Sequence, residues 1–107
     1  MPFIELKNIN EKEIVPGYKA RFIHSENMTT AFWNIEKGYS LPEHSHIHEQ
    51  ISCVIKGEFE LFLDGETQLM NSGKVAVIPA NAIHSGKAIT DCKIIDIFNP
   101  VREDYKT

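Results

Sequence analysis

The sequence predicts an all-β fold, either a barrel or a sandwich, on three observations. Short apolar segments rich in β-branched residues recur at close spacing along the chain. Glycine, proline, asparagine or aspartate bounds most of them, as expected for strands joined by tight turns. No segment shows the apolar period of a long amphipathic helix. Many short strands with turn residues between them are typical of barrels and sandwiches.

Three strands are expected in the first third of the chain. Residues 3–15 predict an edge strand followed by a loop, which a Pro-Gly turn ends. Residues 21–24 and 28–36 predict two more strands, because a polar tripeptide separates two apolar runs. Alternation in the second of these places three side chains on one face: Ala31, Trp33 and Ile35.

A hairpin is expected in the middle of the chain. Residues 51–55 form a strongly β-branched run that favours a strand. Residues 58–64 alternate, which places three apolar side chains on the inner side: Phe59, Leu61 and Leu63. The Asp64-Gly65 pair that follows is a strong hairpin signal, because a type I′ turn needs positive φ at both central residues.

Three more strands complete the predicted fold. Residues 67–70 return from the hairpin, and residues 75–78 form the next strand, which Pro79 ends. Residues 93–98 form a last long strand. The polar residues 101–107 are expected to be a loop or a short helical turn.

Length and composition indicate one ordinary globular domain, covering residues 1–107. Hydrophobic residues make up 42% of the chain and charged residues 24%, and the formal net charge is −4. There is no basic stripe, so binding to nucleic acid is not expected. No apolar run is long enough to span a bilayer, and the first residues do not read as a signal peptide. A cytoplasmic protein without membrane contact is therefore expected.

Neither cysteine is expected to take part in the function, and two of the histidines, His24 and His48, are expected to have other roles. Cys53 and Cys92 lack the spacing of a zinc or redox motif, and Cys53 is expected to be a small buried residue of an apolar strand. His48 is expected to be a neighbour of the functional site. His24 is expected to be structural or to lie at an oligomer interface.

The most informative stretch lies between Gly38 and Gly57, where three histidines and a glutamine fall within seven residues. His44 and His46 have the spacing of alternate strand residues, so both rings can face one ion. Imidazole is a favoured ligand of first-row transition metals. A further candidate ligand, His84, follows the strand at 75–78 and its proline turn.

These residues stand in two motifs that resemble those of the cupin superfamily. The motifs are Gly38-x5-His44-x-His46-x3-Gln50-x6-Gly57 and Gly73-x5-Pro79-x4-His84. The resemblance implies a cupin barrel, that is, a jelly-roll-like double-stranded β-helix. It also implies one divalent transition metal, held by four side chains: His44, His46, Gln50 and His84. The ligand types leave nickel, zinc, manganese and iron open.

Three positions depart from the cupin pattern. Gln50 replaces the more common glutamate, Asn81 stands where the second motif often has glycine, and Ala88 stands where it often has asparagine. A glutamine amide donates its oxygen without charge, so the ion would keep its full positive charge. Such a site polarises a bound oxygen more strongly, but it binds the ion less tightly than a site with a carboxylate.

The end of the chain contains a second group of candidate residues. Asp96 interrupts an otherwise apolar strand, and a buried charge is costly without a partner or a task. If Ile95 and Ile97 face one side of this strand, Asp96 and Phe98 face the other. Arg102 can return a guanidinium to the same place, and guanidinium binds carboxylates bidentately. The alternative interpretation is a structural ion pair between Asp96 and Arg102.

This ending, Asp96-x-Phe98-x-Pro100-x-Arg102-Glu103-Asp104-Tyr105, resembles that of the pectin-degradation (KdgF-like) cupins. The segments 44–50 and 57–61 resemble theirs too. The resemblance implies a metalloenzyme that opens the ring of 4,5-unsaturated uronate monosaccharides, released from pectin or alginate, to the linear keto-acid. It also implies that the residues active in this ring opening are Asp96, Phe98 and Arg102.

The hypothesis gives each of these residues a task. Asp96 moves a proton, Arg102 binds the carboxylate of the sugar acid and Phe98 contacts the ring, while the metal binds a sugar oxygen. A cation near Asp96 would keep it ionised, which favours a base over an acid.

Two other functions stay open at this point. Cupins also include metal-dependent dioxygenases, which oxygen consumption would identify. The other possibility is a non-catalytic sugar-binding module, which would bind a uronate without turnover. The resemblance further implies a homodimer, with the N-terminal strands as a plausible pairing edge.

Overall fold

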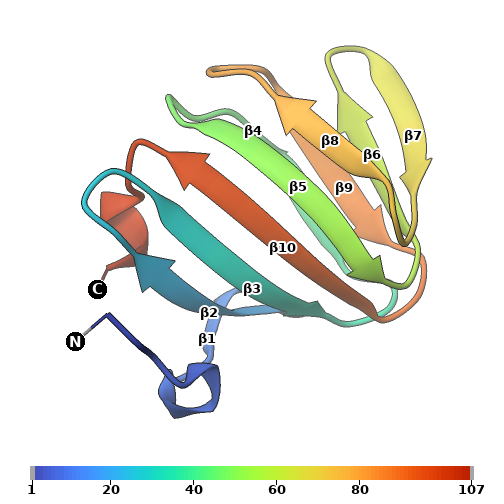
Figure 1. Cartoon of the computed structure of the whole chain (residues 1–107). Helices are drawn as coiled ribbons and strands as arrows, with labels where there is room; N and C mark the ends of the chain where they lie inside the picture. Colours follow the sequence, from blue (N-terminus) through green and yellow to red (C-terminus); the bar gives the residue numbers. More distant parts are fainter. Residues whose placement is uncertain (1, 107) are drawn as a thin grey trace.

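The computed structural model describes residues 2–106, which form two antiparallel sheets that face each other (Figure 1). The larger sheet has the strand order β1-β2-β3-β10-β5-β8, and the smaller sheet has the order β4-β9-β6-β7. Two 3-10 turns, η1 (Leu6–Asn8) and η2 (Glu103–Tyr105), lie near the two ends of the chain. The predicted all-β fold is confirmed. Over the described residues, no helix has the length and hydropathy needed to cross a bilayer.

The strands are short and follow the apolar runs of the sequence. Those of the larger sheet are β1 (Lys12–Val15), β2 (Tyr18–His24), β3 (Thr29–Ile35), β5 (Glu49–Lys56), β8 (Val75–Ile78) and β10 (Cys92–Asn99). Those of the smaller sheet are β4 (Ser40–His44), β6 (Phe59–Leu63), β7 (Glu66–Met70) and β9 (His84–Ala88).

Strand β10 lies inside the larger sheet, between β3 and β5. Its register pairs Asp96 with Ala31 of β3 and with Ser52 of β5. Alternate residues of β10 are buried between the two sheets, while Ile95 and Ile97 point outward, as predicted. The same alternation buries one face of β3. The largest members of the resulting core are Tyr18, Phe22, Trp33, Ile35, Phe59, Leu61, Met70, Ile78, Ile94 and Phe98.

The predicted hairpin after β6 is confirmed. Asp64 and Gly65 have φ angles of 52° and 81°, the left-handed pair that a type I′ turn requires. They join β6 to β7, whose register runs from Phe59 opposite Met70 to Leu63 opposite Glu66. Phe59 and Leu61 are buried, so the inner side of this hairpin was also predicted correctly.

The N-terminal segment differs from the prediction. Residues 3–7 form no strand, and β1 begins only at Lys12. Leu6 instead starts the short turn η1, and the backbone carbonyl of Ile9 accepts a hydrogen bond from Arg21 Nε at 2.9 Å. This bond fixes the end of the segment to β2.

Two further expectations are wrong. Strand β4 ends at His44 and β5 begins at Glu49, so His44 and His46 are not alternate residues of one strand. Their rings converge because the chain turns between β4 and β5. Cys53 is not buried in the core, because it is only half-buried on the outward face of β5, whereas Cys92 is buried. The predicted helical turn near the C-terminus is present as η2, and Thr107 lies outside the described residues.

Candidate active site

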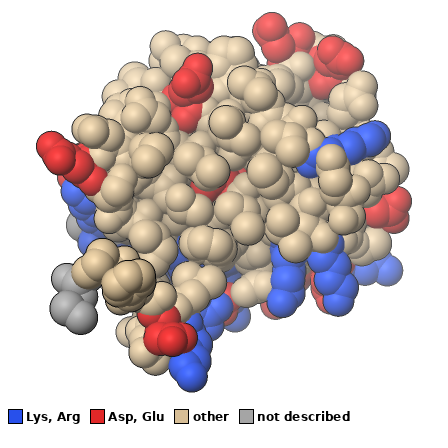
Figure 2. Space-filling model, in the orientation of Figure 1, with Lys and Arg blue, Asp and Glu red and all other residues tan. Residues whose placement is uncertain are grey.

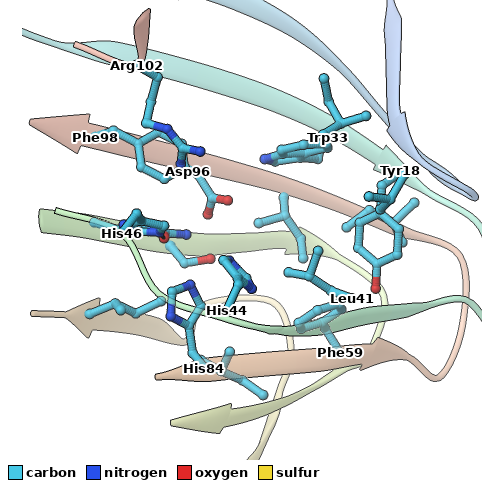
Figure 3. A pocket seen from close by; sticks show the side chains of 18 of the residues that line it. Tyr18, Trp33, Leu41, His44, His46, Phe59, His84, Asp96, Phe98 and Arg102 are labelled. Atoms are coloured by element: carbon cyan, nitrogen blue, oxygen red, sulfur yellow. Dashed lines mark hydrogen bonds between the residues drawn. The ribbon is translucent and has the colours of Figure 1, made fainter. Parts of the chain in front are cut away.

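Three histidines from different parts of the chain meet on one side of the space between the sheets (Figure 3). His44 ends β4, His46 lies in the turn that follows, and His84 begins β9, where it pairs in register with His44. One ring nitrogen from each histidine lies within 4.8 Å of the other two. The predicted histidine cluster is therefore assembled in the structure.

Backbone carbonyls fix the orientation of all three rings. His44 Nδ1 donates to Pro42 O at 2.8 Å, His46 Nδ1 to His48 O at 2.9 Å, and His84 Nδ1 to Ala82 O at 2.9 Å. A neutral imidazole that donates through Nδ1 carries its lone pair on Nε2. All three rings are thus held in the tautomer that leaves Nε2 free to bind a metal, and the carbonyls are the kind of partner that orients metal-binding histidines.

Gln50 belongs to the same cluster. It is buried at the start of β5, and its Oε1 lies 3.1 Å from His46 Nε2. Both atoms are acceptors when His46 donates through Nδ1, so they repel each other unless a cation lies near both. A cation bound by the imidazole nitrogen and the amide oxygen removes this conflict. The donor set therefore fits a divalent transition metal bound by three imidazoles and one amide oxygen.

The charge state of the rings also suits a metal. Burial, and secondly the nearby cation Arg102, lower the pKa of His46 to about 4. Burial likewise lowers the pKa of His84. Both imidazoles are therefore neutral at physiological pH, which is the form that binds metal ions.

Asn81 connects the loop before His84 to the first histidine segment. Its φ angle is 65°, a left-handed conformation that asparagine adopts more readily than other non-glycine residues. Its backbone N–H donates to His46 O at 2.7 Å. Asparagine in place of glycine is thus compatible with the turn, and the hydrogen bond holds the two histidine-bearing segments together. Ala88, another departure, is fully buried at the end of β9.

Asp96 lies across the cavity from the histidines (Figure 3). It is 8% exposed, and burial raises the pKa of its carboxyl to about 6. The side chains of Ser52, Gln50 and Trp33 oppose this rise but do not cancel it. Burial outweighs the nearby Arg102 cation, so the pKa lies above the usual range of a carboxyl, although a group with this pKa is still mostly ionised at neutral pH. A carboxyl with a pKa near 6 can both give and take a proton near neutral pH.

At this wall of the cavity, two buried polar atoms lack a hydrogen-bond partner among the described residues. They are Oδ1 of Asp96 and Nε1 of Trp33. Buried polar groups are nearly always hydrogen-bonded in folded proteins, so each exception calls for an explanation. One is an acceptor and the other a donor, both line the same cavity, and they are close enough for Trp33 to lower the pKa of Asp96. A small movement would pair them with each other, and hydroxyl groups of a bound molecule can also serve as partners.

Arg102 is buried at the mouth of the cavity, where two aromatic rings flank its guanidinium. The carbon Cζ lies 4.7 Å from the ring centre of Phe98 and 4.0 Å from that of Tyr105. Asp104 accepts two hydrogen bonds from Arg102, one from Nε at 3.0 Å and one from Nη2 at 2.8 Å. Nη1 of Arg102 takes part in neither of these two hydrogen bonds. The guanidinium is therefore held on one side by Asp104, with Nη1 on the side that Asp104 leaves open.

The backbone of Arg102 is fixed as well. Its N–H donates to Oγ1 of Thr29, a fully buried residue at the start of β3, at 2.8 Å. The same Oγ1 lies 2.8 Å from His24 Nδ1, which agrees with the structural role expected for His24. Tyr105 stacks on Phe22 with ring centres 4.5 Å apart. These contacts anchor the chain after β10 to strands β2 and β3.

The predicted candidate residues thus come together, with one difference in their pairing. Asp96, Phe98 and Arg102 all line the cavity that the histidines line. The ion-pair partner of Arg102 is Asp104 and not Asp96, so the alternative interpretation of these residues is wrong about the pair. The sequence prediction gave no role to Asp104, Tyr105 or Thr29. Asp104 and Tyr105 could have been identified from the sequence, because they follow Arg102 closely and because acidic and aromatic side chains are common partners of arginine.

The cavity itself contains about 610 Å³ of space free of protein atoms, counting its opening to solvent. The histidines, Asp96 and Arg102 gather on one side of this cavity, and most of the other lining residues are apolar or aromatic (Figure 3). His48 stands beside this end, with its ring centre 5.5 Å from that of His46 and 6.4 Å from that of Phe98. It is a neighbour of the cluster, as predicted.

The sequence and the fold were compared with known proteins. A family model described as a cupin domain matches residues 31–98. The pectin degradation protein KdgF of Dickeya dadantii is 29% identical over 97 residues, which cover 88% of each chain. The structure of KdgF from Halomonas sp. superposes with a TM-score of 0.91 at 27% identity, over 98% of each chain. An RmlC-like cupin from Shewanella frigidimarina gives a TM-score of 0.92 at 26% identity, over 98% of this chain and 96% of that one.

Proposed function

The chain belongs to the cupin domain family, and from this premise we propose that it opens the ring of 4,5-unsaturated uronate monosaccharides. The product would be the linear keto-acid, and the reaction would depend on one divalent transition metal. The observation that carries the proposal is the arrangement of the cavity. A buried carboxyl, a buried arginine and a histidine cluster that could hold a metal ion line the same cavity. The likeness to two KdgF proteins, one of them described as acting in pectin degradation, supports the choice of a sugar acid.

The reaction moves one proton out of the sugar and one proton in. The anomeric hydroxyl loses its proton, its electron pair forms the aldehyde, and the bond from the anomeric carbon to the ring oxygen breaks. The ring oxygen then becomes the ketone oxygen at C5, and the C4–C5 double bond takes up a proton at C4. Because no atom other than hydrogen is transferred, the enzyme needs a proton-transfer group and a means of stabilising charge on oxygen.

Asp96 is the proposed proton-transfer group. Its pKa of about 6 lies close to neutral pH, where transfer in either direction costs little. Its unpaired Oδ1 lies at the cavity wall, where it can accept a bond from a substrate hydroxyl. His44, His46, Gln50 and His84 would hold the metal, which would supply Lewis-acid polarisation of a sugar oxygen.

Arg102 is the proposed binding group for the carboxylate of the substrate. Asp104 occupies Nε and Nη2 on one side, and Nη1 is left for a second carboxylate. Phe98 lies under the guanidinium and lines the cavity, so a sugar held by Arg102 would pass across the face or edge of this ring. Arginine prefers such planar, paired contacts with carboxylates, which lysine cannot reproduce.

The test is a direct assay with unsaturated galacturonate and with the unsaturated uronate released from alginate. The ultraviolet absorbance of the conjugated double bond should fall faster with the protein than without it. Prior treatment with a chelator should remove the effect, and one of nickel, zinc, manganese or iron should restore it. A matched control is Glu60→Gln, an exposed acid on β6 outside the cavity, which should leave the rate unchanged.

Two outcomes would contradict the proposal. The first is a decay of absorbance equal to the spontaneous rate for both sugars with all four metals. The second is oxygen consumption that matches substrate loss, because ring opening uses no oxygen and a dioxygenase does. Binding of the uronate without turnover would identify a sugar-binding module instead.

A further inference from the structure

Two linked hydrogen bonds join Arg102 to the end of strand β2. Thr29, the first residue of β3, is fully buried. Its Oγ1 accepts a hydrogen bond from the backbone N–H of Arg102 at 2.8 Å, and it lies 2.8 Å from Nδ1 of His24, the last residue of β2. His24 and Thr29 are opposite each other in the register of the two strands. One hydroxyl therefore connects the backbone of the proposed carboxylate-binding residue with a titratable ring.

These two bonds have a direction. A hydroxyl group has one hydrogen to donate, and the oxygen of Thr29 already accepts from Arg102. Among residues 2–106, the other hydrogen-bond partner of this hydroxyl is His24 Nδ1. A neutral ring with its proton on Nε2 accepts the hydroxyl hydrogen there, so that all three groups are satisfied. A ring with a proton on Nδ1 has no lone pair to offer, and it leaves a buried hydroxyl hydrogen unpaired, which is destabilising.

The surroundings of His24 set its charge. The groups that face its ring from neighbouring elements are Lys12 of β1, Phe22 of β2, Glu103 and Tyr105 of η2, and Lys106. Figure 2 shows side chains of both charges at this margin of the molecule, on the left, where Figure 1 shows the end of the chain. Burial lowers the pKa of His24, the two ammonium groups lower it further, and the carboxylate and a backbone carbonyl of η2 oppose this without cancelling it. The ring is therefore neutral at neutral pH and gains a proton as the solution is acidified.

The contacts of Arg102 differ in what they are attached to. Asp104 and Tyr105 belong to the same short tail after β10, residues 100–106, and move with it. Thr29 belongs to β3, an interior strand of the larger sheet. Its hydroxyl is thus a direct hydrogen-bonded link between the backbone of Arg102 and the sheet. Paired hydrogen bonds to a carboxylate need defined distances and directions, so a small displacement of Arg102 lowers the affinity.

We propose that Thr29 and His24 are positioning residues for Arg102. They hold it in the geometry that binds a substrate carboxylate while His24 is uncharged, and they release it from this geometry when His24 gains a proton. This role rests on the proposed function, because the carboxylate is that of the proposed sugar acid. Neither residue lines the cavity, so both act through Arg102 and not on the substrate. Substrate affinity then falls in acid for a reason that lies outside the histidine cluster and outside Asp96.

The first test removes the hydroxyl of Thr29. Thr29→Val keeps the shape of the side chain, so KM for the unsaturated uronate should rise about three- to tenfold, the effect expected from one buried hydrogen bond, while kcat stays within about twofold. Thr29→Ser keeps the hydroxyl and should have a KM near that of the wild type. The matched control is Thr30→Val, the same change at the next residue of β3, which points to the other face of the sheet and should change neither constant.

The second test separates the charge of His24 from its hydrogen bond. His24→Phe keeps an aromatic ring without an acceptor, so its KM should be raised at every pH. His24→Asn places an oxygen near the position of Nδ1, so it can accept from Thr29 but cannot gain a proton. Between pH 7.5 and pH 5.5, KM should therefore rise about three- to tenfold more in the wild type than in His24→Asn. Loss of metal and protonation of Asp96 occur in both proteins and cancel in this comparison.

Two further measurements do not need turnover. The backbone N–H of Arg102 donates the bond to Thr29, so NMR can follow its protection from hydrogen exchange. This protection should fall roughly tenfold in Thr29→Val and on acidification of the wild type, but not on acidification of His24→Asn. Saturated galacturonate lacks the double bond that reacts, so calorimetry with this sugar measures binding alone and should rank the variants in the same order.

The outcomes separate the positioning role from the proposed reaction. If the wild type neither binds nor converts a uronate, the proposed function fails, and the role of Arg102 toward a sugar acid fails with it. If the wild type converts the sugar and Thr29→Val does so with an unchanged KM, only the positioning role is overturned. A lower melting temperature of Thr29→Val with unchanged KM and Arg102 protection would show that the hydroxyl is structural. Equal pH dependence of KM in the wild type and His24→Asn would reject the effect of the His24 charge.

Discussion

The two walls of the cavity are built in different ways. On the wall with the histidines, each ring is held by a backbone carbonyl two residues away in the sequence. On the opposite wall, Arg102 depends on Phe98, Tyr105 and Asp104, and its backbone is held by Thr29, which lies 73 residues earlier. On the first wall, local contacts orient the rings, although the three histidines meet only in the folded chain. The second wall needs the assembled barrel, so the two walls should respond differently to mutation.

The largest effect is expected on the histidine wall. The double variant His44→Ala plus His84→Ala removes two of the four proposed ligands, so the purified protein should lose its metal and its activity should fall to the background rate. Elemental analysis and the absorbance assay measure the two effects. His24→Ala is the control for removing a histidine outside the cluster, and it should retain the metal. Undiminished metal in the double variant would reject the ligand assignment.

Asp96→Asn should lower the turnover rate by roughly 10²- to 10⁴-fold, the usual contribution of a proton-transfer group. The variant should keep its metal, since Asp96 is not a proposed ligand. If activity stays within a few fold of the wild type, Asp96 does not carry the proton.

The same variant should be more stable than the wild type when both are metal-free. The folded pKa of Asp96 is raised to about 6, so the folded protein holds this proton more tightly than the unfolded chain does. Stability should therefore fall as pH rises from about 4 to above 6, by up to about 3 kcal/mol at order of magnitude. Asp96→Asn should lack this loss. Denaturant titrations in chelator at pH 4.5 and pH 8 measure it, and a variant that is less stable at pH 8 would indicate a structural role.

Arg102→Lys should act mainly on substrate binding. Lysine keeps the positive charge but loses the paired donors and the stacking between Phe98 and Tyr105, so KM should rise and kcat/KM should fall by roughly 10- to 100-fold. The metal content should not change. An unaltered KM would show that Arg102 does not bind the substrate carboxylate, and thermal unfolding checks that the tail remains folded.

The smallest effect is expected from Asp104→Asn. Its carboxylate orients Arg102, and the Arg102 hydrogen bonds hold the pKa of Asp104 below its usual range. Loss of this pairing should raise KM by a few fold and leave kcat nearly unchanged, because Asp104 does not reach the cavity lining. Glu103→Gln removes the neighbouring acid, which pairs with the exposed Lys106, and should have no effect. Equal changes in both variants would mean that general surface charge, and not orientation of Arg102, is responsible.

The contrast between the walls also explains what the sequence could predict. Most of the strands and the hairpin at Asp64-Gly65 follow from short-range patterns, and the structure contains them. The histidine cluster was predicted from the two motifs, and its three histidines do come together. The convergence of His44 and His46 was predicted, but the predicted cause was wrong. The two residues do not alternate along one strand, because β4 ends at His44. Alternation did predict that Asp96 and Phe98 point inward.

Long-range contacts could not be predicted from the sequence. The pKa of Asp96 depends on how completely the barrel buries it, and the amount of burial cannot be read from its neighbours in the chain. The choice of Asp104 as partner of Arg102 depends on the turn η2, which places both side chains on one side of the tail. Cys53 was predicted to be buried and is only half-buried, because the apolar character of a strand does not tell which of its two faces is covered.

The tail after β10 has a practical consequence for protein engineering. Residues 100–106 belong to no strand, yet they supply Arg102, its partner Asp104 and the aromatic cover of Tyr105. The histidine cluster takes none of its proposed ligands from this segment. A mutant library confined to these seven positions would therefore test the proposed recognition of a sugar acid without changing any proposed metal ligand.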